Sequence, residues 1–448
     1  MAPGLNGEVS PAGGAWERAD SATRRPRAPG VRGQGAPRGG ERMGLPADLF
    51  APEHYAATRR PIREASTLPP YCYWAPEFYA REEERIFLRE WLCVGRAEQV
   101  PEAGDFFSAE VCGRPLIVVR EKGGGIRAHL NSCRHRGTAI AEGDGHCTAF
   151  HCPYHNWTYA LSGELLGTPE MEEARGFDKG QYGLLPVRLE TWGGFLFVNF
   201  DPGSPPLLEL LGELPALMKN YKVEAMVCTR RQTYEVRCNW KVYVENAMEE
   251  YHTPTVHKSV YTDRVPLESW VVEETRGLYE ILYTETQGSL ALLGDEGFPP
   301  IPGLSPKELV GSYIPYVYPS LVFLISPDTM FYVIVEPKGP EHSTISMGNC
   351  FPASTAARPD FEAMAKRYYN RTSTTLPQDN NACEWQQRGI RAPGAQPGRY
   401  SVREQLVHHI ANYVLDRVLG PASIDSSGGS VGRWGWRKLP AAAGRPGG

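Results

Sequence analysis

Four residues in the first half of the chain have the types and spacing of metal ligands. Cys133 and His135 are separated by one residue, and Cys152 and His155, separated by two, follow sixteen residues later. Thiolate sulfur and imidazole nitrogen are ligands that soft and borderline transition metals prefer. Because each pair combines one cysteine with one histidine, the pattern predicts a metal centre held between two loops.

The mixed pairs favour a two-iron cluster over a single zinc ion. In a Rieske [2Fe–2S] centre two cysteines hold one iron and two histidines hold the other, so each loop supplies one ligand to each iron. A structural zinc site is the alternative interpretation, because two cysteines and two histidines also suit zinc. Zinc fingers with this ligand set, however, usually combine one pair of cysteines with one pair of histidines. His146, Cys147 and His151 lie between the two pairs. We expect these three to pack around the centre rather than bind it.

A second candidate site lies in residues 239–257, where His252 and His257 are five residues apart. On a continuous helix this spacing would turn the two side chains about 140° apart, a poor geometry for one metal. Pro254 changes the expectation, because proline disfavours helix at the preceding residue and donates no backbone hydrogen bond. We therefore expect His252 to close a helix and His257 to return from the turn beyond it.

Two histidines and one carboxylate form the facial triad of non-haem Fe(II) oxygenases. The carboxylates considered for the third position are Glu245, Glu249, Glu250 and the remote Asp379, which is expected at the start of a late helix. Glu249 precedes His252 by three residues, so the two would share one helix face. A pair of core histidines without a metal is the alternative. The upstream Cys/His pairs favour the oxygenase, because an oxygenase of this kind needs both centres.

The elements that must position these residues divide the chain into two domains with flanking segments. We predict a disordered extension over 1–45, a helical segment over 46–98, an all-β domain over 99–203 that carries both Cys/His pairs on its loops, a catalytic domain over 204–422 and a flexible tail over 423–448. Helices are predicted within 70–96 and over 207–221, from 239, and over 359–370, 379–388 and 401–419; strands are predicted over 105–120, 126–130, 194–199, 225–238, 312–325, 329–337 and 343–351.

Composition limits the partners of the chain. A net charge of −5 gives no electrostatic reason to expect nucleic acid or an anionic membrane surface. No apolar run approaches the ~20 residues of a bilayer span. The ten cysteines are scattered apart from Cys133, Cys147 and Cys152, which indicates mostly free thiols in a reducing compartment. We expect a cytoplasmic protein, or one of an organelle matrix if the Arg-rich residues 1–42 are a transit peptide; Met43 is an alternative start to Met1.

Taken together, these motifs identify a resemblance. The chain resembles the α subunit of Rieske non-haem iron oxygenases (the aromatic-ring-hydroxylating dioxygenase family), and is most similar to the branch with choline, glycine betaine and carnitine monooxygenases. The resemblance covers about residues 50–420 and rests on the segments CRHRG, CPYHNWTY, NWKVYVEN, MEEYHTPTVH and QDNNACEWQQRG.

The resemblance implies an α+β fold, in which an all-β Rieske domain precedes a helix-grip (START/SRPBCC-like) catalytic domain with an antiparallel sheet. It implies a [2Fe–2S] cluster, a mononuclear non-haem Fe(II) held by His252, His257 and Asp379, and a homotrimer in which Glu249 bridges the two centres across a subunit boundary. Glu384 is the fallback for the third iron ligand. A flavin- or ferredoxin-type reductase would pass electrons from NAD(P)H to the cluster, and O2 would be used to oxidise a small organic substrate.

The substrate is predicted less directly. The branch and Glu249 favour a quaternary ammonium compound that is hydroxylated or demethylated, and an aromatic compound is the alternative. A trimethylammonium group could lie in a cage of aromatic residues, but their alternation on strands favours core packing: Tyr313, Tyr316, Tyr318, Phe323, Phe331 and Tyr332. A Rieske ferredoxin would not need the second domain, and a structural zinc protein with a ligand-binding domain is the non-enzymatic alternative.

Overall fold

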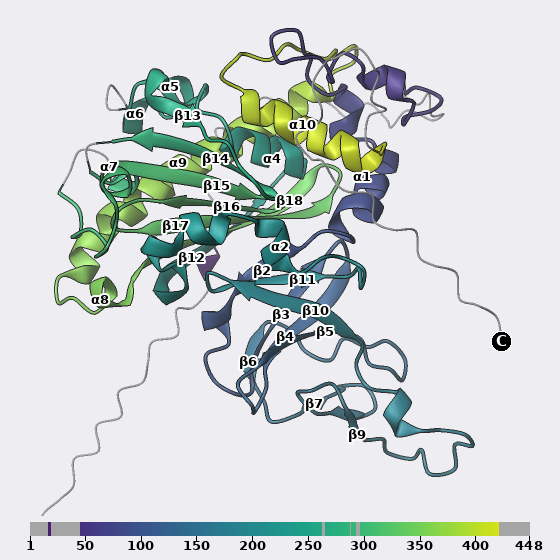
Figure 1. Ribbon diagram of the computed structural model, residues 1–448. Helices are drawn as coiled ribbons and strands as arrows, with labels where there is room; N and C mark the ends of the chain where they lie inside the picture. The colour runs from purple at the N-terminus through teal and green to yellow at the C-terminus, as the bar shows by residue number, and fades with distance from the viewer. Residues whose placement is uncertain (1–16, 19–44, 262–264, 287, 293–295, 421–448) are drawn as a thin grey trace, which may run out of the picture.

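A computed structural model describes residues 17–18, 45–261, 265–286, 288–292 and 296–420, which form two units built on separate sheets (Figure 1). The expected N-terminal extension, including Met1 and Met43, and the expected C-terminal tail lie outside these residues, apart from Leu45 and the short strand β1 (Glu17–Arg18). Among the described residues, every helix is too short or too polar to span a bilayer.

The smaller unit, in the lower half of Figure 1, is all-β. Its seven-stranded sheet has the order β2-β11-β10-β5-β4-β3-β6, and a three-stranded sheet β7-β8-β9 lies beyond it. The strands are β2 (Leu92–Arg96), β3 (Asp105–Val111), β4 (Arg114–Arg120), β5 (Ile126–Leu130), β6 (Asp144–His146), β7 (Phe150–His151), β8 (Thr158–Tyr159), β9 (Leu165–Gly167), β10 (Pro186–Trp192) and β11 (Phe195–Asn199). Because β2 belongs to this sheet, we propose a domain boundary nearer residue 90 than 99.

Strand β4 separates two apolar cores. Successive side chains on a strand point to opposite faces. Leu116 and Val118 pack into the main core of the molecule, whereas Ile117 and Val119 pack into a smaller core that contains Cys133 and Cys152. The two faces of β4 thus pack against both cores and connect the loops that carry the Cys/His pairs to the rest of the molecule.

The larger unit is an eight-stranded sheet of order β1-β12-β18-β17-β16-β15-β14-β13, antiparallel apart from the β1–β12 pair. Its further strands are β12 (Met226–Val236), β13 (Trp270–Val272), β14 (Tyr279–Glu285), β15 (Gly311–Val317), β16 (Leu321–Ile325), β17 (Met330–Gly339) and β18 (His342–Pro352). The long helix α9 (Phe361–Ile390) crosses one face of this sheet (Figure 1). The predicted α+β class, with an all-β domain and an antiparallel helix-grip domain, is confirmed.

The remaining helices are short, except α10 at the C-terminal end. They are α1 (Pro76–Glu82), α2 (Leu207–Leu211), α3 (Leu214–Leu217), α4 (Trp240–Ala247), α5 (Thr253–Val256), α6 (Lys258–Tyr261), α7 (Pro306–Val310), α8 (Ala353–Ala356) and α10 (Gln405–Val418). The helix predicted over 207–221 is interrupted at Gly212, where φ is +53° and a side chain would collide with the Arg276 carbonyl. The helical pattern within 70–96 gives α1, a π turn and then strand β2.

Two helices predicted over 359–370 and 379–388 are one helix, which corrects that expectation. Helix α9 continues through Pro377, whose ring removes one backbone hydrogen bond. Threonine hydroxyls of the preceding turns donate to main-chain carbonyls: Thr374 to Asn370 and Thr375 to Arg371. Asp379 therefore stands in the interior of a 30-residue helix and not at the start of a new one.

Candidate metal centres

The two loops with the Cys/His pairs have the same backbone construction. The Cys133 N–H donates to Thr138 O at 2.8 Å, and Gly137 N–H returns to Cys133 O at 2.8 Å. In the second loop Cys152 N–H donates to Trp157 O at 2.8 Å and the residue four positions on donates to Cys152 O at 3.0 Å. That residue is Asn156, which shares with Gly137 a positive φ (+56° and +79°).

The loops bury their cysteines and expose their histidines. Cys133 and Cys152 are each 3% exposed, whereas His135 is exposed and His155 is half-buried. The two imidazole rings lie 4.7 Å apart. A tyrosine that the sequence did not single out, Tyr159, lies 3.2 Å from Cys133 Sγ through its hydroxyl. The pairs thus face one another, with sulfur inside and imidazole at the surface.

The geometry of these four residues does not suit one zinc ion. Bonds of about 2.0–2.3 Å to a tetrahedral zinc bring all ligand atoms within about 4 Å of one another. No three of Cys133, His135, Cys152 and His155 offer ligand atoms within 4.8 Å of one another. A two-iron cluster separates its cysteine end from its histidine end, so it does not need all four ligand atoms this close together. The four residues therefore fit the cluster better than the zinc alternative.

The residues between the two pairs have other contacts, as expected. His146 Nδ1 lies 2.8 Å from Asp105 Oδ1, and His151 Nδ1 lies 3.0 Å from Thr158 Oγ1. Cys147 packs beside the smaller core.

His252, His257 and Asp379 converge from separate segments. Each offers one ligand atom, and these three atoms lie within 4.8 Å of one another. Asp379 Oδ1 is 2.9 Å from His257 Nε2 and 3.5 Å from His252 Nε2. The three form the one group of at least three His, Cys, Asp or Glu with this spacing in the described part of the chain.

The other ring nitrogen of each histidine faces an amide or carboxylate oxygen. His252 Nδ1 lies 2.6 Å from Glu249 Oε1, and His257 Nδ1 lies 2.8 Å from Gln378 Oε1. Because these oxygens accept, each Nδ1 carries a hydrogen, and each Nε2 is the ring nitrogen that faces Asp379 and is left to bind a metal. Gln378 was not foreseen from the sequence, since a glutamine next to a ligand gives no distinctive spacing.

One atom tests whether a metal fits here. Asp379 Oδ1 is buried and makes no hydrogen bond of acceptable angle, despite its short distances to both histidines. Burial alone lowers the pKa of His252, but the neighbouring carboxylates of Asp379 and Glu249 raise that pKa to about 10. The surroundings thus favour positive charge between His252, His257 and Asp379. A divalent cation bound there would supply this charge in place of the His252 proton.

The chain between the helices differs from the expectation. Helix α4 ends at Ala247, so His252 does not close it. His252 instead stands at the N-cap of α5, and its carbonyl accepts from Thr255 N–H and Val256 N–H, both at 2.9 Å. Pro254 is tolerated because N–H groups in a first helical turn have no partner inside the helix. His257 follows this single turn, which brings the two rings to 5.2 Å.

The other candidate carboxylates do not reach the triad as ligands. Glu245 is buried and accepts a hydrogen bond from Tyr73 Oη at 2.9 Å. Glu384, the fallback for the third position, pairs with Arg237 at 2.8 Å. Glu250 accepts a hydrogen bond from Thr253 Oγ1 at 2.6 Å and lies beside the triad without joining it. Of the carboxylates considered, Asp379 is the one that the structure brings to both histidines.

A cavity of about 100 Å³ lies beside the triad. Its lining combines charged residues with an apolar wall, namely Ile314, Val322, Leu324, Phe331 and Val333. Of the six aromatic residues considered for a trimethylammonium cage, Phe331 alone lines this cavity. The other five are buried, which confirms core packing for them and corrects the cage interpretation: Tyr313, Tyr316, Tyr318, Phe323 and Tyr332.

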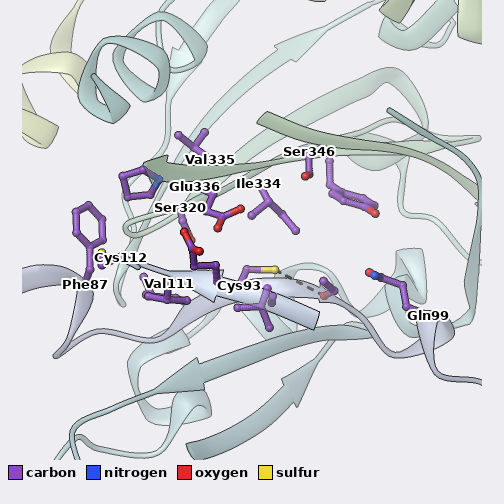
Figure 2. A pocket seen from close by; sticks show the side chains of 17 residues that line it. Phe87, Cys93, Gln99, Val111, Cys112, Ser320, Ile334, Val335, Glu336 and Ser346 are labelled. Atoms are coloured by element: carbon purple, nitrogen blue, oxygen red, sulfur yellow. Dashed lines mark hydrogen bonds between the residues drawn. The ribbon is translucent and has the colours of Figure 1, made fainter. Parts of the chain in front are cut away.

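A second cavity, of about 70 Å³, lies between β2 and β17, away from the triad (Figure 2). Figure 2 shows Cys93, Cys112 and Glu336 around it. Burial raises the pKa of each of these two thiols to about 12, so both stay protonated near neutral pH. Protonated thiols are poor ligands and nucleophiles. This cavity therefore offers no second candidate for metal chemistry.

The two candidate centres are far apart within one chain. Figure 1 shows strands β7 to β9, next to the Cys/His loops, at one end of the molecule. Helix α5, between His252 and His257, lies at the other end. Electron tunnelling falls steeply with distance, so this separation disfavours direct transfer between the two centres of one chain.

Comparison with known proteins identifies both domains of the chain. Residues 90–186 match the Rieske [2Fe–2S] domain, and residues 223–420 match the ring hydroxylating alpha subunit catalytic domain. Chloroplastic choline monooxygenase of Arabidopsis thaliana is 29% identical over 365 residues, which cover 78% of this chain and 82% of that protein.

Two further comparisons agree. The carnitine monooxygenase oxygenase subunit of Acinetobacter baumannii is 27% identical over 339 residues, 74% of this chain and 86% of that one. The solved quaternary ammonium Rieske monooxygenase CntA shares the fold with a TM-score of 0.69 at 24% identity, covering 79% of this chain and 95% of that one. The chain therefore belongs to the Rieske non-haem iron oxygenases, O2-dependent enzymes with a [2Fe–2S] cluster and a mononuclear iron, as an α subunit.

Proposed function

We propose that this oxygenase hydroxylates, or oxidatively demethylates, a small quaternary ammonium compound. The convergence of His252, His257 and Asp379 beside a cavity, in a chain that also carries two mixed Cys/His loops, is the observation that carries the proposal. The choline and carnitine monooxygenases among the relatives support the substrate class. The apolar wall of the cavity suits N-methyl groups.

The residues have separate roles in this proposal. Cys133 and Cys152 would hold one iron of the cluster, His135 and His155 the other, and the triad would hold the mononuclear Fe(II). When bound, the cluster supplies electrons one at a time and the mononuclear iron supplies the O2 chemistry. Glu249 and Gln378 fix the tautomers of the two histidines, and the buried wall keeps water from the substrate.

Electrons would pass between subunits rather than within one chain. The separation of the two centres in Figure 1 supports this, as does the inter-subunit electron transfer described for CntA. We propose a homotrimer in which a reductase delivers electrons from NAD(P)H and Glu249 joins His252 to an exposed histidine of the neighbouring cluster. Replacing Glu249→Gln should leave both metals bound and reduce turnover at least ~10-fold. Near-normal turnover with full metal content would remove Glu249 from the path.

Substrate-dependent O2 consumption tests the proposed class. The purified chain, supplied with a reductase and NADH, should consume O2 with one of choline, glycine betaine, carnitine or stachydrine. An aromatic substrate is the second candidate, because residues 223–420 match the ring hydroxylating family. Consumption with benzoates and with none of the quaternary ammonium compounds would replace the proposed class by the aromatic one.

A further inference from the structure

The cavity beside the triad contains a buried arginine that the metal site does not require. Arg371, Thr375 and Asp379 recur every four residues on α9, so they share one face of the helix, and all three line the cavity. Eight helical residues rise about 12 Å, which places Arg371 two turns from the proposed ligand Asp379. The guanidinium and the triad therefore belong to one cavity, at different depths along α9.

Arg371 keeps a charge in surroundings that disfavour one. Its side chain is 8% exposed, and its guanidinium carbon lies 5.5 Å from the centre of the Phe331 ring. Burial lowers its pKa to about 10, although the carboxylates of Glu250 and Asp379 act in the opposite direction. A guanidinium with this pKa is still cationic near neutral pH. Glu250 and Asp379 already supply negative charge near the guanidinium, and a ligand carboxylate beside it would add charge-assisted hydrogen bonds.

The shape of the guanidinium indicates which anion fits. Arginine presents parallel N–H donors that match the two oxygens of a carboxylate. The apolar residues of the same cavity, Ile314, Val322 and Leu324, offer no donor to an anion and suit methyl groups instead. The lining also contains the carboxylates Glu249, Glu250 and Asp379, which suit a cationic group. A molecule with a carboxylate at one end and a trimethylammonium group at the other would therefore match the guanidinium, the apolar residues and these carboxylates.

We propose that Arg371 binds a carboxylate of the substrate; on the proposed function, this makes the substrate a quaternary ammonium carboxylate and not an alcohol such as choline. The carboxylate anchored at Arg371 would direct the methyl-bearing end toward the triad. Choline has no carboxylate to accept the paired N–H donors, so it would gain nothing from the guanidinium. Arg371 is in this account a specificity-determining residue, which contacts the substrate and not the metal.

Equilibrium binding tests the proposal without turnover. Anaerobic calorimetry on the iron-loaded protein would compare glycine betaine with choline, which share the trimethylammonium group and differ in carboxylate against hydroxymethyl. The wild type should bind glycine betaine at least ~10-fold more tightly. Arg371→Met should weaken glycine betaine roughly 10- to 100-fold and leave choline unweakened. Arg371→Lys keeps the charge without the forked donors, so its affinity for glycine betaine should lie between those of the wild type and of Arg371→Met.

Controls separate binding from folding. Lys366→Met removes an exposed cation from the same helix and should change neither affinity. The visible absorption of the cluster reports whether each variant is folded; if Arg371→Met loses it, Arg371→Lys carries the test. Equal binding of choline and glycine betaine by the wild type, or an unchanged preference in Arg371→Met, would overturn the proposal. Arg371-dependent binding of benzoate but not of glycine betaine would support the carboxylate assignment and overturn the proposed substrate class.

Discussion

Asp379 completes a site whose three ligand atoms are positioned by two elements, α5 and α9. Helix α9 brings its carboxylate, the N-cap of α5 brings His252, and the end of that single turn brings His257. Burial raises the pKa of Asp379, but its interactions with both histidines outweigh burial and hold that pKa below its ordinary value. The carboxylate is therefore ionised at neutral pH and ready to bind a cation.

Replacing Asp379→Asn should release the mononuclear iron and leave the cluster in place. The amide keeps the shape of the side chain but removes the anionic oxygen that the facial triad needs. Iron analysis should show a fall from about three atoms per chain to about two, with unchanged visible absorption. Glu384→Gln, one turn further along α9, is the control and should keep all the iron, because Glu384 pairs with Arg237. Full iron in Asp379→Asn would contradict the assignment.

At the scale of elements, a buried ion pair joins the N-terminal helix α1 to helix α4, which precedes the triad. Lys241 Nζ lies 2.5 Å from Glu82 Oε1, and both side chains are fully buried. Trp240 Nε1 donates to the same carboxylate at 3.1 Å. Removing one partner of such a pair leaves an uncompensated charge in the core.

Lys241→Met should therefore lower the free energy of unfolding by about 3–5 kcal/mol, measured by denaturant titration. Adding Glu82→Gln should restore much of the loss, because glutamine is neutral and still accepts from Trp240. Lys307→Met is the surface control: Lys307 pairs with Glu273 while half exposed, and its loss should cost less than about 1 kcal/mol. A Lys241→Met chain as stable as the wild type would show that this pair contributes nothing.

The boundaries and continuity of the helices and strands were the features that the sequence predicted least well. The Cys/His pairs, the His252–His257 pair and several strands of the large sheet could be predicted from spacing and alternation. Strands β13 and β14 were not predicted, and β15 and β16 were expected as one strand. The continuity of α9 through Pro377 could not, because proline normally argues for a helix end and the packing of α9 against α4 is visible only in three dimensions. The same limit concealed Arg371, since a single arginine on a helix gives no sign of facing a cavity.

At the scale of the whole molecule, stability should depend on pH through Glu245. Burial raises the pKa of Glu245 to about 8, from the 4.5 expected in an unfolded chain. The folded chain thus binds this proton more tightly, and its contribution to stability is present below pH 4.5 and is lost as pH rises toward 8. The free energy of unfolding should fall across this window, and Glu245→Gln should reduce the slope.

Denaturant titrations at intervals between pH 5 and pH 8 would measure the two slopes. Glutamine can still accept the hydrogen bond from Tyr73, so the variant should remain folded. Glu268→Gln, an exposed position, should keep the wild-type slope. Equal slopes in the wild type and in Glu245→Gln would show that this carboxyl titrates normally.

The central claim concerns the whole molecule: one chain carries a cluster that supplies electrons and a separate iron site that uses them. EPR of the reduced, anaerobically purified protein tests it most directly. The account predicts a Rieske signal with an average g value below 2, which disappears when the wild type is mixed with O2 and its substrate. His257→Ala should show the same signal and keep it on mixing. A protein that contains zinc and gives no such signal, or loss of the signal in His257→Ala, would contradict the account.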